Sequence, residues 1–462
     1  MLTQNIGMIV KASGGKIIQR GKNNKIMGIS TDSRDIKTAS LFIPLVGDKF
    51  DGHNFLLDAK LKGANAVLYE KGKNIDFDKL KDIYIIEVAD SLRALQDISM
   101  AYRNLFNIPL IAVTGSTGKT STKDIISDVL LVKFNVLKNI GNFNNHIGLP
   151  LTILNLKEEH QIGVLEMGMT GLGEISELSR IVKPHIGVIT NIGMSHIGRL
   201  GSRDNIMRAK LELADYLGEG DYLLLNGDND YLSTIKDEEA PYQKIFFGLS
   251  EENDFYPKRL ENLGEKGYSF FIKLDGKESY FRIKEPGIHN VYNAMAAIWI
   301  GNYFKMDVEK IKLGLENYTP SRMRMESKIF NGVKVINDAY NASPDSMKAA
   351  LDILRSMDGE RKIAILGNMF ELGEFSREAH RNVGKYIGDG VDILITVGQM
   401  AEEIANEAIA MGMDPNQIYR TMTNDQVIRL LGGLVKKKDI ILVKGSRGMT
   451  MEEIVHYLQE RS

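Results

Sequence analysis

The stretch 110–131, LIAVTGSTGKTSTKDIISDVLL, decides the fold of this 462-residue chain. Its apolar beginning predicts a strand over Leu110–Val113, and its later part predicts a helix over Thr122–Leu131. The glycine-rich segment between them has the composition and the position of a loop that wraps a phosphate group at the start of a helix. The stretch therefore predicts a nucleotide-binding α/β domain, in which a buried strand carries such a loop to the edge of a mostly parallel sheet.

The loop lacks the first glycine of the common phosphate-loop pattern, because Val113 stands in that place and only G-x-x-G-K-T remains. A chance turn rich in glycine, serine and threonine is the alternative. The flanking strand, Lys119 and Thr120 favour a true phosphate loop, since the lysine reaches the β- and γ-phosphates and the hydroxyl can bind Mg2+. We therefore predict ATP and Mg2+ as cofactors. The nucleotide-binding set predicted in the loop comprises Thr114, Gly115, Ser116, Thr117, Gly118, Lys119 and Thr120.

Outward from this stretch, short strands alternate with helical patterns, which predicts doubly wound, mostly parallel sheets. We predict an α/β protein of three domains: a small α/β domain at 1–106, a central domain with a P-loop-type sheet at 107–318, and a C-terminal Rossmann-like domain at 319–462. The segment Phe246–Ile283 alternates in character and predicts a small antiparallel insert. The other expected elements are a helix at Ser91–Phe106 and strands at Ala66–Tyr69, Tyr84–Val88, Gly163–Leu165, Ile186–Thr190, Tyr222–Leu225, Val333–Ile336, Ile363–Leu366, Ile393–Val397 and Ile440–Val443.

The composition excludes several kinds of protein. The chain has no cysteine, which excludes disulfides, thiolate metal sites and a cysteine nucleophile, so any metal must use oxygen and nitrogen ligands. Its 58 basic and 60 acidic side chains nearly balance, which argues against a nucleic-acid coat or a polybasic membrane anchor. The first residues lack the apolar core of a signal peptide, and no apolar run approaches the ~20 residues that span a bilayer. These features predict a cytoplasmic protein with no nucleic-acid partner and no stable membrane insertion.

Two side chains that can bind a metal follow other predicted strands. Glu166 comes directly after the strand at Gly163–Leu165, and His196 lies in the loop after the strand at Ile186–Thr190. Because the carboxyl ends of parallel strands meet at one edge of a sheet, both are expected beside the phosphate loop. A solvated loop acid and a hydrogen-bonded turn histidine are the alternatives. Their shared position favours Mg2+ held near the ATP phosphates.

Lys210 occupies an unusual place in a predicted helix. The stretch Ser202–Leu217 predicts a helix with Ser202 as its N-cap, and Lys210 lies in the middle of the apolar stripe, four residues after Ile206 and four before Ala214. A lysine that reaches solvent from the edge of the stripe is the alternative. Burial lowers the pKa of a lysine, and a neutral amine can react with CO2 to form a carbamate, which binds metals. We therefore predict, as a hypothesis, a carbamate at this lysine.

Two further segments suggest contacts with the nucleotide. Asn290 and Asn293 lie one helical turn apart, and their carboxamides can read an adenine edge with both a donor and an acceptor. A simple N-cap is the alternative for Asn290. Asp338 could bind ribose hydroxyls and Arg324 could reach phosphate. The alternative there is a helix entry capped by Ser343.

Together these motifs resemble the ATP-dependent Mur ligase family of peptidoglycan synthesis, in order and over essentially the whole chain. The loop TGSTGKTS is the family's form of the phosphate loop, which explains the missing first glycine. Asn337 replaces an acid of some members and Ser343 stands where asparagine is common, but neither departure removes a group that performs the chemistry. The other segments that carry the resemblance are Thr31–Arg34, Phe42–Gly47, Asp51–His53, Asn142–Pro150, Asp338–Met347, Leu366–Gly373 and Lys444–Gly448.

The resemblance implies a role for each motif residue. The catalytic residues that it implies are Lys119, His196 and Lys210. The Mg2+ ligands that it implies are Thr120, Glu166, His196 and a carbamylated Lys210. Asn290, Asn293, Arg324 and Asp338 join the phosphate loop in binding the nucleotide, and Arg322 is an alternative to Arg324 at the phosphate. The substrate-binding residues that it implies are Ser33, Arg34, Asn142, Asn144, Asn145, Tyr340 and Asn341.

The resemblance also implies an activity. It is the ATP-dependent ligation of D-alanyl-D-alanine to UDP-N-acetylmuramoyl-tripeptide through an acyl phosphate, by a monomer whose first domain binds the UDP-sugar and whose last domain binds the amino substrate. The third residue of the tripeptide, L-lysine or diaminopimelate, stays open. A ligase that adds this third residue is expected to carry an Asp-Asn-Pro-Arg motif, which the sequence lacks. The alternative from another class, a non-catalytic nucleotide-binding scaffold, gives no reason for Lys210 on an apolar stripe.

Overall fold

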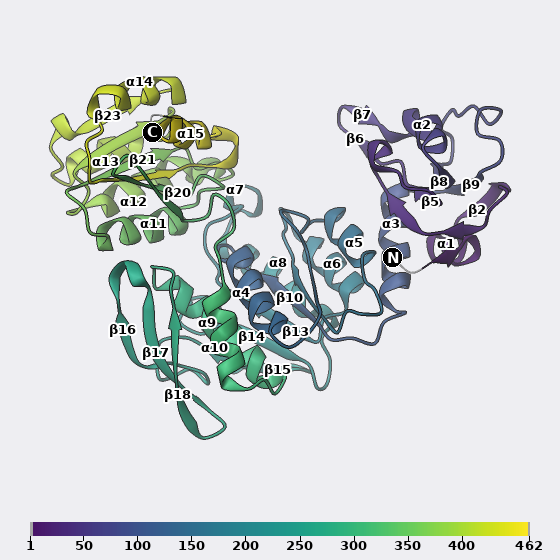
Figure 1. Cartoon of the computed structure of the whole chain (residues 1–462), viewed down its shortest axis with the longest axis horizontal. Helices are drawn as coiled ribbons and strands as arrows, with labels where there is room; N and C mark the ends of the chain where they lie inside the picture. The colour runs from purple at the N-terminus through teal and green to yellow at the C-terminus, as the bar shows by residue number, and fades with distance from the viewer. Residues whose placement is uncertain (1–2, 461–462) are drawn as a thin grey trace.

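The computed structural model describes residues 3–460, so residues 1, 2, 461 and 462, at the ends of the first and last predicted domains, lie outside the described residues. The elements form three successive α/β parts, and the first and last stand apart from each other on either side of the central one (Figure 1). The predicted α/β class is confirmed, while the boundaries at 106 and 318 stay a prediction. Within residues 3–460, no helix is long and apolar enough to cross a bilayer.

The first part is built on a five-stranded sheet with the order β2-β9-β8-β5-β4. Its strands pair in parallel except for β2, which runs antiparallel to β9. β9 matches the predicted strand Tyr84–Val88, and β8 extends the predicted Ala66–Tyr69 at both ends. The elements are α1 (Ile6–Ser13), β2 (Lys16–Gln19), β4 (Gly28–Ser30), β5 (Ser40–Phe42), α2 (Leu56–Leu61), β8 (Ala64–Glu70) and β9 (Tyr84–Val88), with the short pairs β1 (Gln4–Asn5) and β3 (Lys25–Ile26), and β6 (Val46–Gly47) and β7 (Phe50–Asp51).

Helix α3 (Ser91–Arg103) joins the first part to the central part. Its side chains are bonded to carbonyls of the central part: the Tyr102 hydroxyl donates to Leu156 O at 2.7 Å, and Arg103 Nε donates to Val182 O at 2.8 Å. The helix ends three residues before the predicted Phe106, because the chain there turns toward the first central strand. A helix expected inside the first domain therefore packs on both parts.

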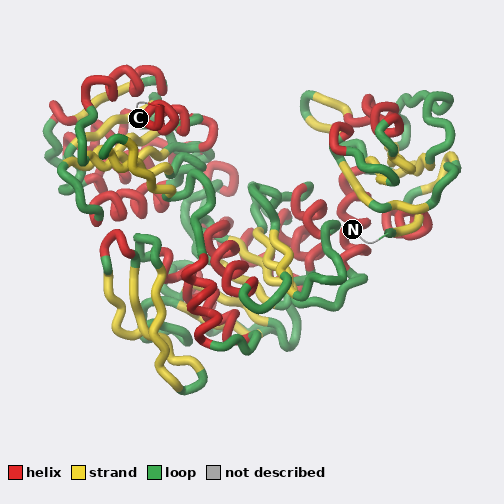
Figure 2. Tube along the Cα trace, in the orientation of Figure 1, coloured by secondary structure: helices red, strands yellow, loops and turns green. Residues whose placement is uncertain are grey.

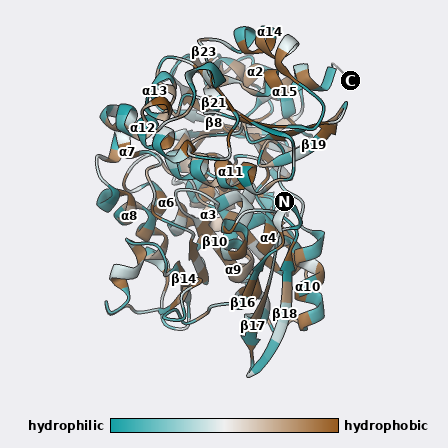
Figure 3. Ribbon diagram, turned by 90° about the vertical axis from the view of Figure 1, so that its left-hand side faces the viewer, coloured by the Kyte–Doolittle hydropathy of each residue, from teal (hydrophilic) through white to brown (hydrophobic). Residues whose placement is uncertain are grey.

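The central part contains a fully parallel six-stranded sheet with the order β11-β12-β10-β13-β14-β15. Strand β10 lies inside it, with Ile111 and Val113 in the cluster packed under α4 and α9, and with Leu110 and Ala112 in the cluster of the opposite face. Figure 3 shows the hydrophobic colour on inner strands such as β14. The strands are β10 (Leu110–Thr114), β11 (Val136–Lys138), β12 (Ile162–Glu166), β13 (Ile186–Ile189), β14 (Tyr222–Asn226) and β15 (Gln243–Phe247). The helices are α4 (Lys119–Leu131), α5 (Gly148–Ile153), α6 (Glu174–Val182), α7 (Ile197–Leu200), α8 (Arg203–Leu211), α9 (His289–Tyr303) and α10 (Val308–Asn317).

The predicted antiparallel insert is present but shorter than expected. Phe246 and Phe247 belong to β15 of the parallel sheet, and the insert is the three-stranded unit β16 (Lys258–Asn262), β17 (Tyr268–Leu274) and β18 (Lys277–Ile283). Figure 2 shows these strands in yellow beside the helices of the central part.

The last part has a six-stranded sheet with the order β19-β20-β24-β21-β22-β23. Only the pairing of β19 with β20 is antiparallel within this sheet of the described chain. Helix α11 begins with Pro344 directly after the N-cap Ser343, as predicted. Ser343 and Ser346 form a capping box, in which the side chain of each is bonded to the backbone N–H of the other. The elements are β19 (Glu326–Phe330), β20 (Val333–Asn337), α11 (Pro344–Ser356), β21 (Arg361–Gly367), α12 (Ser376–Ile387), β22 (Ile393–Val397), α13 (Glu402–Ala410), β23 (Ile418–Thr421), α14 (Asn424–Leu434), β24 (Asp439–Lys444) and α15 (Glu452–Glu460).

Candidate active site

The phosphate loop lies between β10 and α4, as the sequence predicts. Gly115 and Gly118 have φ angles of +148° and +79°, which favour glycine, and a Cβ on Gly115 would meet Thr190 Oγ1 at 1.9 Å. The chain after β13 holds the loop from outside: Thr117 N–H donates to Asn191 Oδ1 at 2.9 Å. The loop is therefore held in a fixed conformation at the N-terminus of α4, where a helix favours an anion.

Lys119 and Thr120 begin α4, three residues earlier than the predicted helix, because Gly118 already serves as its N-cap. Lys119 Nζ folds back over the loop and donates to Gly115 O at 2.8 Å. Burial lowers the pKa of Lys119, whereas the nearby Glu166 carboxylate acts in the opposite direction. A lysine held this way is poised to offset phosphate charge at the loop.

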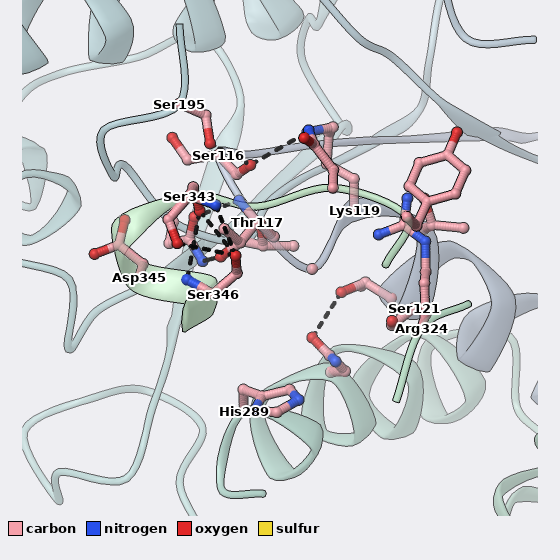
Figure 4. A pocket seen from close by; sticks show the side chains of 18 of the residues that line it. Ser116, Thr117, Lys119, Ser121, Ser195, His289, Arg324, Ser343, Asp345 and Ser346 are labelled. Atoms are coloured by element: carbon pink, nitrogen blue, oxygen red, sulfur yellow. Dashed lines mark hydrogen bonds between the residues drawn. The ribbon is translucent and has the colours of Figure 1, made fainter. Parts of the chain in front are cut away.

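A cavity of ≈ 780 Å³ lies against the phosphate loop. Its walls come from both the central and the last part: Figure 4 shows Lys119 from the loop, His289 from the start of α9, and Asp345 from the start of α11, all bordering it. The predicted site residues that line it are Ser116, Thr117, Gly118, Lys119, Thr120, Asn142, Asn144, Asn145, Glu166, His196, Asn290, Asn293, Arg324, Asp338, Tyr340 and Asn341. The predicted residues that are not among its lining are Ser33, Arg34, Thr114, Gly115 and Lys210.

Glu166 is the last residue of β12 and is 2 % exposed, so it is not a solvated loop acid. Its carboxylate accepts hydrogen bonds from Thr120 Oγ1 and from Asn144 Nδ2, both at 2.7 Å. Its backbone N–H donates to the buried Asn139 amide oxygen at 3.0 Å. The carboxylate is thus fixed beside the first turn of α4.

His196 is the N-cap residue of α7 and has a φ of +66°, in the left-handed region that residues with side chains rarely adopt. Its Nδ1 lies 2.7 Å from Glu371 Oε2, across the junction between the central and last parts. This contact has the distance of an ion pair, although the ring N–H is not aligned as a hydrogen bond. The contact leaves Nε2 as the nitrogen not engaged by Glu371.

Lys210 lies on the buried face of α8, as predicted, and is 1 % exposed. Burial lowers its pKa well below 10.5, and the positive charge of Lys119 acts in the same direction. The side chain does not reach solvent, so the alternative of an edge lysine is wrong. The predicted helix to Leu217 ends instead at Leu211 and continues as a 3-10 turn, Glu212–Tyr216, in which the Glu212 carboxylate accepts from Gly173 N–H at 2.7 Å.

The four predicted Mg2+ ligands are only partly assembled. Among the described residues, no three His, Asp or Glu side chains form a group that could hold a metal. Thr120 and Glu166 nevertheless fit Mg2+, because they place a hydroxyl and a carboxylate together at the phosphate loop, and Mg2+ commonly takes few protein oxygens beside phosphates and water. His196 contacts Glu371, and the buried Lys210 is not among the residues that line the cavity. The complete ligand set stays a prediction.

Asn290 is not the N-cap of its helix, because α9 begins at His289 and its capping position is Ile288. Asn290 Nδ2 donates to Pro286 O at 2.9 Å, and Asn293 Oδ1 accepts from Thr122 Oγ1 at 2.8 Å. Both carboxamides are buried and line the cavity, and Asn293 contacts the first turn of α4, which follows the phosphate loop. The N-cap alternative is therefore wrong, and a role in reading the base stays a prediction.

Arg324 reaches the cavity, whereas Arg322 is exposed and is not among the lining residues. The Arg324 guanidinium lies over the Tyr340 ring, 4.2 Å from its centroid. Asp338 pairs with Lys444, and its other oxygen accepts from Met325 N–H at 3.1 Å. The last part thus contributes the cations Arg324 and Lys444 and the acids Asp338, Asp345 and Glu371 to the cavity lining.

Ser33 and Arg34 lie in the first part, away from this cavity, in a single 3-10 turn. The Arg34 side chain is 87 % exposed and pairs with Asp32 at 2.8 Å. That hydrogen bond lowers the pKa of Asp32 to about 2. The turn therefore presents at the surface an exposed guanidinium that is paired with Asp32.

Comparison with known families covers most of the chain. Residues 25–112 match the model described as "Mur ligase family, catalytic domain", residues 113–301 match "Mur ligase middle domain", and residues 321–447 match "Mur ligase, glutamate ligase domain". The UDP-N-acetylmuramoyl-tripeptide–D-alanyl-D-alanine ligase of Bacillus subtilis (strain 168) is 41 % identical over 438 residues, which cover 94 % of this chain and 93 % of the relative. The chain belongs to the Mur ligase family.

Solved structures of Mur ligases share the complete architecture. MurF from Acinetobacter baumannii superposes with a TM-score of 0.90 at 29 % identity and covers 99 % of both chains. MurF from Thermotoga maritima in complex with ADP superposes with a TM-score of 0.82 at 27 % identity and covers 94 % of this chain and 98 % of that one. The three-part fold of this Mur ligase is therefore that of the solved relatives.

Two residues that shape this Mur ligase site were not predicted individually. Glu371, in the quoted segment Leu366–Gly373, contacts His196, and Asp345 accepts from Met194 N–H at 3.3 Å. Both contacts join the last part to the chain after β13. The sequence shows the order of the motifs, but it does not show which motifs meet in space. Contacts between residues that lie 150 or more positions apart could therefore not be predicted from it.

Proposed function

We propose that the protein is an ATP-dependent ligase that joins D-alanyl-D-alanine to UDP-N-acetylmuramoyl-tripeptide, in the cytoplasm, as the last amide-forming step of peptidoglycan precursor synthesis. The observation that carries this proposal is the cavity in which the phosphate loop of the central part faces cations of the last part. The full-length similarity to the ligase of Bacillus subtilis supports the same reaction.

Each part is assigned one substrate group. The first part holds the UDP end through Ser33 and Arg34, since an exposed guanidinium suits a diphosphate. The central part binds ATP through the phosphate loop, Asn290 and Asn293. The last part receives D-alanyl-D-alanine, with Tyr340 and Asn341 at the shared cavity. The monomeric state belongs to this proposal.

The first chemical step forms an acyl phosphate. The terminal carboxylate of the tripeptide attacks the γ-phosphorus of ATP, and the bond to the ADP oxygen breaks. Lys119 and Arg324 offset the negative charge that spreads over the transferring oxygens, and the backbone N–H groups of the loop fix the phosphates in line. Catalysis of this kind is mainly positioning and electrostatics, so no protein nucleophile is needed.

Mg2+ would be held through Thr120 and Glu166, with His196 and Lys210 as the further ligands that the family pattern implies, and it would supply neutralising charge at the phosphates. Lys210 fits the carbamate hypothesis because its lowered pKa leaves more of the amine neutral. The amine adds to CO2 and loses one proton, which gives an anionic oxygen donor. A carbamate on Lys210 would be a buried anion, which needs a positive partner.

The second step forms the amide. The amine of D-alanyl-D-alanine attacks the acyl phosphate, the carbon–oxygen bond breaks, and inorganic phosphate leaves. Asn142, Asn144 and Asn145 line the cavity and are assigned to substrate binding beside the phosphate loop. Because an acyl phosphate hydrolyses in water, contact between the central and last parts serves to exclude water during this step.

A nucleotide-binding scaffold without turnover is the competing function. The two are separated by measuring phosphate release with ATP, UDP-N-acetylmuramoyl-tripeptide and D-alanyl-D-alanine, and with each omitted. The ligase predicts release that depends on all three and a product heavier by the dipeptide. Release that ignores either substrate, or no release, would reject it. The tripeptide is supplied in its L-lysine and diaminopimelate forms.

A further inference from the structure

The chain that follows β13, residues 191–198, is here called the bridging segment. Its inner side holds the phosphate loop. Gly193 N–H donates to Ser116 Oγ at 2.8 Å, and Ser195 Oγ donates to Ser116 O at 3.1 Å, in addition to the bond that Asn191 accepts from Thr117. A shift of the bridging segment would therefore move the loop that binds phosphate.

The outer side of the bridging segment meets the last part, and Glu371 contacts it at two points. The Glu371 carboxylate lies 2.7 Å from His196 Nδ1, and its backbone carbonyl accepts from Gly198 N–H at 3.1 Å. The approach is close: a Cβ on Gly198 would lie 2.5 Å from Gly373 N. Glu371 is thus the residue through which the last part touches both the imidazole and the start of α7.

Both members of the pair have unfavourable backbone conformations. His196 has a φ of +66° and Glu371 a φ of +64°, although neither is glycine or asparagine. Such conformations persist only where the surroundings enforce them, and they gather at functional sites. Two residues with such backbone conformations face each other across the junction. We infer that their contact is maintained against the conformational preference of each backbone.

The Glu371 carboxylate lies among positively charged side chains. Besides the contact with His196, the charges of Arg199 and Lys119 act on it. The carboxylate therefore faces the lysine of the phosphate loop as well as the histidine.

We propose that Glu371 is a positioning residue for His196: it holds Nδ1 of the imidazole and the Gly198 amide, so that Nε2 is presented to the cavity only while the last part is docked. A carboxylate on the second nitrogen is the usual means of fixing the tautomer and the direction of a functional histidine. The misaligned N–H fits this role, since such contacts commonly tighten when substrate binds. The use made of Nε2 rests on the proposed function, whereas the contact itself does not.

The direct test is the tautomer of His196 in the full-length protein. The histidines are labelled with 15N, and the His196 signals are assigned by their loss in His196→Gln. We expect the Nδ1–H tautomer in the wild type, a mixture of tautomers in Glu371→Ala, and an intermediate spectrum in Glu371→Gln, which keeps a weaker acceptor. Glu374→Ala is the matched control, because Glu374 is an exposed acid in the same loop, and its spectrum should equal that of the wild type. An unchanged His196 tautomer in Glu371→Ala would overturn the proposal.

A kinetic readout separates positioning from a structural role. Loss of a carboxylate that orients a functional histidine typically costs 10- to 100-fold in activity, so we expect kcat of Glu371→Ala to fall by that factor. KM for the UDP-tripeptide should stay within about twofold, because that substrate is held by the first part. Glu371→Asp should recover part of the loss. Equal loss in Glu371→Ala and Glu374→Ala would overturn the proposal.

Two outcomes keep the proposals distinguishable. A wild type without ligase activity would reject the proposed function, while the tautomer measurement would still decide the role of Glu371. If Glu371→Ala melts earlier than the wild type, Glu371→Gln decides instead, because it preserves the size of the side chain. An unchanged kcat and tautomer in Glu371→Gln would then count against the proposal.

Discussion

Replacing Gly198 by alanine should block docking of the last part without harming the fold. Gly198 lies in α7 with its backbone against the loop of the last part, and a Cβ there would lie 2.5 Å from Gly373 N and 2.8 Å from Glu371 O. Both neighbours are backbone atoms that cannot rotate away. The two parts must therefore separate, since neither contact can be relieved by a side chain.

The size of the effect follows from these distances. The shorter one is 0.9 Å below the 3.4 Å at which ordinary contact begins, so the parts must move apart by about 1 Å. A misplacement of about 1 Å can cost on the order of 100-fold in rate. Alanine is also a better helix former than glycine by roughly 1 kcal/mol, so α7 itself should not be weakened. We expect kcat/KM to fall about 100-fold at an unchanged thermal midpoint.

The assay is ligation by Gly198→Ala beside Gly433→Ala. Gly433 lies in α14 with nothing within 4 Å of its would-be Cβ, so its alanine variant controls for the substitution itself. ADP binding should persist in both variants, because the phosphate loop lies in the central part. Full activity of Gly198→Ala would refute the reasoning that contact between these two backbones is required. A lowered thermal midpoint would refute the claim that only docking is affected.

Two further substitutions test the buried lysine and the exposed arginine. Lys210→Met should abolish ligation yet raise stability by about 1–3 kcal/mol, because a buried polar amine is replaced by an apolar chain of similar length. Since the folded pKa of Lys210 lies below 10.5, the unfolded chain binds more protons at this side chain, so Lys210 contributes stability that increases as the pH rises toward 10.5. The difference in thermal midpoint between Lys210→Met and the wild type should therefore change with pH, and equal slopes of the two proteins would contradict this. Arg34→Ala should raise KM for the UDP-tripeptide about tenfold, the equivalent of one charged hydrogen bond, at unchanged kcat and thermal midpoint. A fall in kcat with constant KM would place Arg34 elsewhere in the reaction.

Elements whose formation depends on local sequence could be predicted closely. The strands Tyr84–Val88 and Ile393–Val397 match β9 and β22, because each is a buried apolar run bounded by polar or turn residues. The caps Ser202 and Ser343 also match, because a side-chain oxygen beside a helix start has few other uses. The phosphate loop was recognisable because its chemistry resides in one continuous segment.

Features that depend on distant contacts could not be predicted. An N-cap was the alternative for Asn290, but Ile288 occupies the capping position and the carboxamide donates to Pro286 O. The strand pattern predicted Glu166 and His196 at one edge of the sheet. Glu166 is bonded to neighbours in the central part, whereas His196 contacts Glu371 of the last part. Nothing local in the sequence indicates that two parts of the chain meet there.

The fate of the oxygen atoms tests the central claim most directly. The terminal carboxylate of UDP-N-acetylmuramoyl-tripeptide is labelled with 18O, and the released phosphate is analysed by mass after a single turnover with ATP and D-alanyl-D-alanine. An acyl phosphate intermediate predicts one 18O atom in each phosphate, because the carboxylate oxygen that attacks phosphorus leaves with it. Phosphate without 18O, formed together with the amide product, would contradict the account.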